Sequence, residues 1–111
     1  MVRETVGSPL AEAMNRLWTK FLPQMVQRVT TLQRAAESAA KGTLGVAEQQ
    51  AASSDAHKLA GVLGTFGLQE GTELAREAEN LYAGTLDGSA AISARLTQIA
   101  EQLRTIVASR L

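Results

Sequence analysis

The chain has 111 residues, a length that fits a single domain with one hydrophobic core. Lysine and arginine together number 11, as do aspartate and glutamate, so we expect no basic surface for nucleic acid or an anionic membrane. The absence of cysteine excludes disulfides and thiolate-bound metals, and no stretch approaches the roughly 20 apolar residues that span a bilayer. Since the N-terminus also lacks the apolar segment of a signal peptide, we expect a cytoplasmic protein.

The N-terminal part of the chain is predicted to hold a disordered segment and a short helix. Residues 1–7 have no periodicity and are expected to be disordered, whereas residues 8–111 are expected to form the domain. Ser8 followed by Pro9 is typical of an N-cap with proline at the first helical position. Because proline within a helix removes a hydrogen bond, Pro23 is expected to open a second helix.

Further along the chain, apolar residues recur at helical spacing. The second helix is expected to end at the glycine-containing segment 41–45, and two more helices are expected over 46–66 and 69–82. A turn and cap signal at 87–89 precedes the last one. No segment shows the apolar alternation of a strand. We therefore predict an all-α fold, an antiparallel up-down-up-down four-helix bundle with a short N-terminal capping helix.

His57 is the only histidine, and it lies away from the apolar side of its predicted helix. At about 100° per residue, a stripe roughly 80° wide is formed by Ala52, Ala56, Leu59, Leu63 and Phe66. His57 points about 140° from the middle of this stripe, towards solvent. Its neighbours on the same side are all small: Ser53, Ser54, Ala60, Gly61 and Gly64. We predict that these five residues form a docking surface around an accessible imidazole.

The glycines of this helix have two interpretations. Each of Gly61 and Gly64 costs the helix about 1 kcal/mol relative to alanine, so each needs a reason. Close packing of a neighbouring helix is one reason, and clearance for a docking partner is the other. We favour the docking partner, because neither glycine lies near the apolar stripe. Gly67 follows the end of the apolar pattern and is expected to terminate the helix.

The residues after His57 follow a pattern: an apolar residue at +2, glycine at +4 and glycine at +10. This pattern, in the run Ala56-His57-Lys58-Leu59-Ala60-Gly61 and at Gly67, resembles that of histidine-containing phosphotransfer (HPt) domains. The helix over 74–81, which bears arginine and glutamate, is also similar to the family's. The resemblance extends from about Trp18 to the C-terminus and agrees with the predicted bundle.

The resemblance implies reversible phosphorylation of one imidazole nitrogen of His57. A neutral imidazole dominates near neutral pH and offers a lone pair as the nucleophile. In this family the partner, a response-regulator receiver domain or a hybrid sensor kinase, supplies the aspartate and Mg²⁺. The chain itself is expected to be a monomer that needs no cofactor and binds no metal. It has no phosphate-binding loop motif, so we expect a phosphocarrier and not an ATP-dependent enzyme.

One position departs from the family pattern. HPt domains commonly carry lysine three residues after the histidine, where it helps the incoming phosphoryl group. This chain has Ala60 there, and the nearest lysine is Lys58, roughly 100° round the helix from His57. Lys58 and Arg76 are the two candidates for the missing charge, and the sequence does not choose between them.

Three other functions are weighed against the phosphocarrier. The alanine at +3 leaves open a bundle that binds a receiver-like partner without accepting phosphate, as a scaffold or inhibitor. The dimerisation helices of a sensor kinase have an acidic residue after the histidine and a Thr-Pro pair beyond it, whereas this chain has Lys58 and no proline after Pro23. A hydrolase triad is disfavoured because Ser53 lies one turn from His57 on the same helix, with no evident oxyanion hole.

Overall fold

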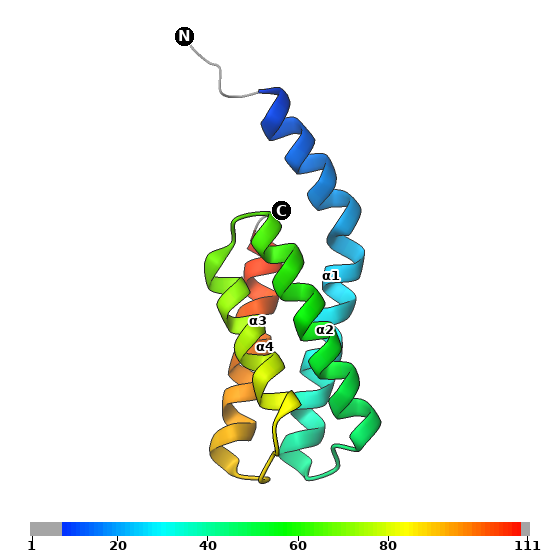
Figure 1. Cartoon of the computed structure of the whole chain (residues 1–111), viewed down its shortest axis with the longest axis vertical. Coiled ribbons are helices and arrows are strands. Elements are labelled where there is room, and N and C mark those ends of the chain that lie inside the picture. The colour runs from blue at the N-terminus through cyan, green and yellow to red at the C-terminus, as the bar shows by residue number, and fades with distance from the viewer. Residues whose placement is uncertain (1–7, 110–111) are drawn as a thin grey trace.

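The structure, a computed structural model, describes residues 8–109 as four helices with short connections (Figure 1). The helices are α1 (Pro9–Lys41), α2 (Val46–Thr65), α3 (Gln69–Ala83) and α4 (Ala90–Ser109). Within this described part of the chain there is no strand, in agreement with the predicted all-α class. The segment 1–7, expected to be disordered, lies outside the described residues.

Contacts between consecutive helices show how the bundle is assembled. Trp18, near the start of α1, packs edge-to-face on Phe66 at the end of α2, with ring centroids 5.0 Å apart. At the other end of the same pair, Ser38 donates a hydrogen bond to Glu48 at 2.9 Å. These two helices therefore run antiparallel. Each helix packs against its neighbours in the chain, α1 closes the ring against α4, and α2 and α4 lie at diagonal corners.

The expectation of a separate N-terminal capping helix was wrong. Pro23 lies inside α1, which runs without a break for 33 residues. The proline removes the hydrogen bond to the Thr19 carbonyl, a change that costs about 3 kcal/mol. Trp18 and Met25 are buried on either side of it, and burying two such side chains offsets that cost. At about 1.5 Å per residue, α1 is about 50 Å long, so its first turns project beyond the bundle and leave Leu10 exposed (Figure 1).

The end of α2 follows the prediction for Gly67. Gly67 has a φ of 71°, a left-handed conformation that glycine adopts without a steric penalty. Its N–H donates to the Gly64 carbonyl at 3.0 Å, and the Leu68 N–H donates to the Leu63 carbonyl at 3.0 Å. These two bonds form a Schellman motif, which satisfies the last carbonyls of the helix. The following turn brings α3 back along α2.

The core contains the apolar stripe that was predicted for α2. The members that are fully buried are Ala52, Ala56, Leu59 and Leu63. They pack in one cluster with buried residues from all the other helices, among them Leu32, Ala75, Ala78 and Leu103. Because this stripe faces inward, the opposite side of α2 faces solvent, and that side carries His57.

An ion pair between α3 and α4 makes part of the stability depend on pH. Arg95 donates two hydrogen bonds to Glu77, from Nε at 2.7 Å and from Nη2 at 2.6 Å. The hydrogen bonds from Arg95 hold the pKa of Glu77 below its ordinary value. The pair therefore stabilises the fold above that ordinary pKa, and the contribution is lost as the pH falls through the lowered one.

We expect Glu77→Gln to reduce the free energy of unfolding by at most about 1 kcal/mol at pH 7, because both partners are partly exposed. At pH 3, below the ordinary pKa of Glu77, the difference between the variant and the wild type should be smaller, because the pair's contribution is lost as the pH falls. Thermal unfolding of both proteins at the two pH values measures this. A deficit of the same size at pH 3 would assign the effect to packing instead of charge.

Candidate functional site

His57 stands in the middle of α2 with 72% of its side chain exposed, as expected. Its Nδ1 lies 2.9 Å from Oε2 of Glu79, which is on α3. Among residues 8–109 it is the only hydrogen bond to the imidazole, and it uses one of the two ring nitrogens. The other nitrogen, Nε2, therefore has no protein partner among residues 8–109.

The carboxylate of Glu79 decides which ring nitrogen carries the proton. An ionised carboxylate only accepts hydrogen bonds, so a neutral imidazole beside it places its proton on Nδ1. The lone pair of the neutral ring then lies on Nε2. The same hydrogen bond limits rotation of the ring. In the neutral ring, this hydrogen bond therefore orients an unprotonated Nε2.

Side chains from α2 hold the last turns of α3 in place. Nε2 of Gln49 donates to the Tyr82 carbonyl at 2.7 Å and to the Gly84 carbonyl at 3.1 Å. Ser53 donates to the Glu79 carbonyl at 3.4 Å. These bonds fix the backbone of α3 beside α2 and so bring the Glu79 carboxylate within reach of the imidazole.

An open groove of about 590 Å³ adjoins His57. It lies between the first half of α2 and the end of α3, and its lining residues are Val46, Gln49, Gln50, Ser53, Ser54, His57, Glu79, Tyr82 and Ala83. Tyr82 forms part of the inner wall, and burial raises the pKa of its hydroxyl, so the phenol stays protonated. The groove extends from the histidine towards the Val46 end of α2.

The residues predicted to surround His57 are only partly where they were expected. Ser54, Gly61 and Gly64 are exposed and Ser53 is half-buried. Ala60 is only 5% exposed, so its assignment to the docking surface was wrong. It lies about 60° round α2 from His57, on the side that packs against α3. The accessible surface therefore consists of the serines on one side of the imidazole and the glycines on the other.

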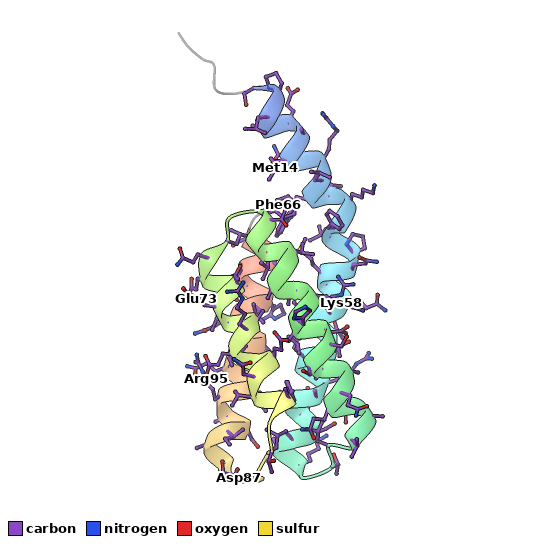
Figure 2. All side chains as sticks on the ribbon, in the orientation of Figure 1. Met14, Lys58, Phe66, Glu73, Asp87 and Arg95 are labelled. Atoms are coloured by element: carbon purple, nitrogen blue, oxygen red, sulfur yellow. The ribbon has the colours of Figure 1, made fainter. Side chains whose placement is uncertain are left out.

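The two candidate cations lie on opposite sides of the site. Lys58 is exposed and lies on the side of α2 that is nearer α1 (Figure 2). Arg76 is exposed on α3, one turn before Glu79. Among residues 8–109, neither forms an ion pair.

Glu79 is the site residue that the sequence reasoning missed. It belongs to the helix whose glutamates were noted, but no role was assigned to it. The feature that could have pointed to Glu79 is its position on the helix. Ala75 and Tyr82, one turn to either side, are both buried, so Glu79 lies at the border of the core face. A carboxylate at such a border is held close to the neighbouring helix. This signal does not identify the partner on that helix.

Comparison with known proteins agrees with this geometry. The family model of the Hpt domain matches residues 16–106, so the chain belongs to the Hpt domain family. Hpt domains are phosphocarriers of phosphorelays that act through histidine, and they are not enzymes. No curated protein and no solved structure matches the chain. In the described part of the chain, no helix is both long and apolar enough to cross a membrane.

Proposed function

We propose that His57 accepts a phosphoryl group from the aspartate of a receiver domain and returns it to such an aspartate. The observation that carries this proposal is the hydrogen bond between Nδ1 of His57 and Glu79, which leaves Nε2 available on an exposed side chain. His57 is also the only histidine in the chain, so a histidine phosphocarrier has no other acceptor. The antiparallel contacts support an up-down-up-down bundle as the frame that holds this residue outward.

The transfer is a displacement at phosphorus. Nε2 forms a bond to phosphorus while the bond to the aspartyl oxygen breaks, and that oxygen keeps the bonding electron pair. The imidazole becomes positively charged because Nδ1 retains its proton. Glu79, which accepts that proton in a hydrogen bond, stabilises the charge, and the effect is the same in the reverse direction. The partner supplies the aspartate and Mg²⁺, and most of the remaining catalysis is positioning.

The partner is a receiver domain of a response regulator or a hybrid sensor kinase, and we propose that it contacts a monomer of this protein. The exposed part of the predicted surface supports this docking, since small side chains allow a partner to come close to the imidazole. Ser54 and Gly61, one turn to either side of His57, are both exposed.

A non-phosphorylated scaffold is the second candidate. It is favoured by one observation, the replacement of the family's lysine at +3 by Ala60, which is buried against α3. A scaffold needs the docking surface but no charge that stabilises a phosphoryl group.

The two functions are separated by incubating the protein with receiver domains that carry a labelled aspartyl phosphate. We expect an acid-labile, base-stable label on the protein, with the phosphorus NMR signal of a histidine phosphorylated at Nε2. A signal from an Nδ1 adduct would contradict the role given to Glu79. Binding of receivers without any label would support the scaffold.

A further inference from the structure

The contacts between α2 and α3 fix which residues of the two helices lie at the same level. His57 meets Glu79, and a Cβ built on Gly64 would lie 3.6 Å from Oγ1 of Thr72. Seven residues forward along α2 therefore correspond to seven residues back along α3. The register between the helices is constant over two turns, as it is for a straight antiparallel pair.

This register places Arg76 opposite Ala60. Arg76 comes three residues before Glu79, and Ala60 comes three residues after His57. The separation of either residue from the level of the His57–Glu79 pair is about 4.5 Å along the helix axis. Ala60 is the position where similar domains carry lysine. Arg76 of α3 is therefore at the level where α2 lacks the lysine of similar domains.

Arg76 also lies on the correct side of α3. It is about 60° round the helix from Glu79, in the direction away from buried Ala75 and Ala78. His57 has the corresponding position on α2: it lies on the solvent side of the face of α2 that packs against α3. Both side chains thus flank the outer side of the seam between the two helices. Ala60 contributes only a methyl group there, so no side chain at that position separates them.

Lys58 does not share this arrangement. It is about 100° round α2 from His57, on the side nearer α1 and away from α3 (Figure 2). Its ammonium would have to reach back across the surface of its own helix. Within residues 8–109 no carboxylate binds either cation, in contrast to Arg95, which is paired with Glu77, so the difference between Arg76 and Lys58 is one of position.

We infer that Arg76 takes over the function of the missing lysine and donates hydrogen bonds to the phosphoryl oxygens during transfer at His57. This inference rests on the proposed phosphocarrier function. A guanidinium has five N–H donors in a planar fork that fits two phosphoryl oxygens at once. The guanidinium stabilises the negative charge of the phosphoryl group while the bond to Nε2 forms and the bond to the donor oxygen breaks. It takes up no proton.

The test compares Arg76→Gln with Lys58→Gln. Each substitution removes one exposed cation near His57, the first from α3 and the second from α2. Transfer to His57 is measured from a phosphorylated receiver and from phosphoramidate, a small donor that needs no protein docking. We expect Arg76→Gln to slow transfer from both donors about tenfold and Lys58→Gln to slow it less than twofold. Arg76→Lys should restore part of the rate, since it returns the charge without the fork.

The outcomes distinguish this inference from the function on which it rests. If the wild type takes up no label at His57, the phosphocarrier function itself fails. If the wild type is labelled but Arg76→Gln is as fast, or slows only the receiver reaction, Arg76 is not the charge-stabilising group. A larger effect of Lys58→Gln than of Arg76→Gln on the phosphoramidate reaction would overturn the assignment in favour of Lys58. Unchanged melting temperatures confirm that the variants are folded.

Discussion

Replacing His57 by glutamine should abolish phosphoryl acceptance and leave the fold intact. The variant retains no imidazole, because His57 is the only histidine in the chain. Its side chain is 72% exposed and makes one hydrogen bond, to a carboxylate that is itself partly exposed. Exposed side chains of this kind usually contribute within about 0.5 kcal/mol to stability. Labelling by a phosphorylated receiver and thermal unfolding measure the two effects separately.

The melting temperature of the His57→Gln variant should therefore change by no more than a few degrees, since about 1 kcal/mol corresponds to roughly 4–8 °C in a domain of this size. Lys58→Gln, at the next residue of the same helix, serves as the matched control and should keep the label. Persistent labelling of the His57→Gln variant would move the phosphoryl site to another residue. A large fall in melting temperature would instead make His57 a structural residue.

Much of the fold was predictable because its signals are local. Ser8 caps α1 by accepting a hydrogen bond from the Ala11 N–H at 3.0 Å, as the Ser-Pro pair indicated. Ser89 likewise accepts one from the Ile92 N–H at 3.1 Å at the start of α4. Each signal depends on a few consecutive residues, so no knowledge of the tertiary structure is needed. The exposure of His57 followed from the helical period in the same way.

The prediction that Pro23 opens a new helix was wrong because it considered only the local preference of proline for the start of a helix. The sequence pattern does not show how much free energy is gained by burying the residues around Pro23 in one continuous helix. Residues on both sides of the proline pack into the same core, and a single helix buries them without a new turn. For α1, the free energy of this packing outweighs the lost hydrogen bond. A rule about proline applies to an isolated helix, whereas α1 lies against α2 and α4.

Ala60 and Glu79 illustrate the other limit of the sequence. A helical wheel gives the angle of Ala60 relative to His57, but it does not say that α3 lies at that angle. The meeting of His57 with Glu79 depends on the register between two helices, which the turn at Gly67 and the contacts of Gln49 establish. These are tertiary facts. The sequence therefore identified the phosphoryl-acceptor candidate but not the carboxylate that orients it.

Gly61→Leu should leave the bundle as stable as the wild type, or more so, and slow transfer from a receiver at least tenfold. Nothing lies within 4 Å of a Cβ built on Gly61, so the leucine would extend into solvent, and the helix gains most of about 1 kcal/mol. Gly61 is one turn beyond His57 and about 40° from it round the helix. A partner that must bring phosphorus to attack distance would meet this side chain, and a misplacement of about 1 Å costs up to 100-fold in rate. Transfer from phosphoramidate should not change.

The same substitution at Gly64 is a less direct test, because a Cβ built there would lie 3.6 Å from Thr72 of α3.

Ala94→Leu is the matched control for Gly61→Leu, since Ala94 is exposed on α4, the helix diagonal to α2. It should alter neither stability nor transfer. If Gly61→Leu also leaves receiver transfer intact, the partner does not cover the glycine side of His57, and the groove on the Ser53 side becomes the docking site. If it slows both donors equally, the leucine obstructs the imidazole itself, and the effect would not report on docking.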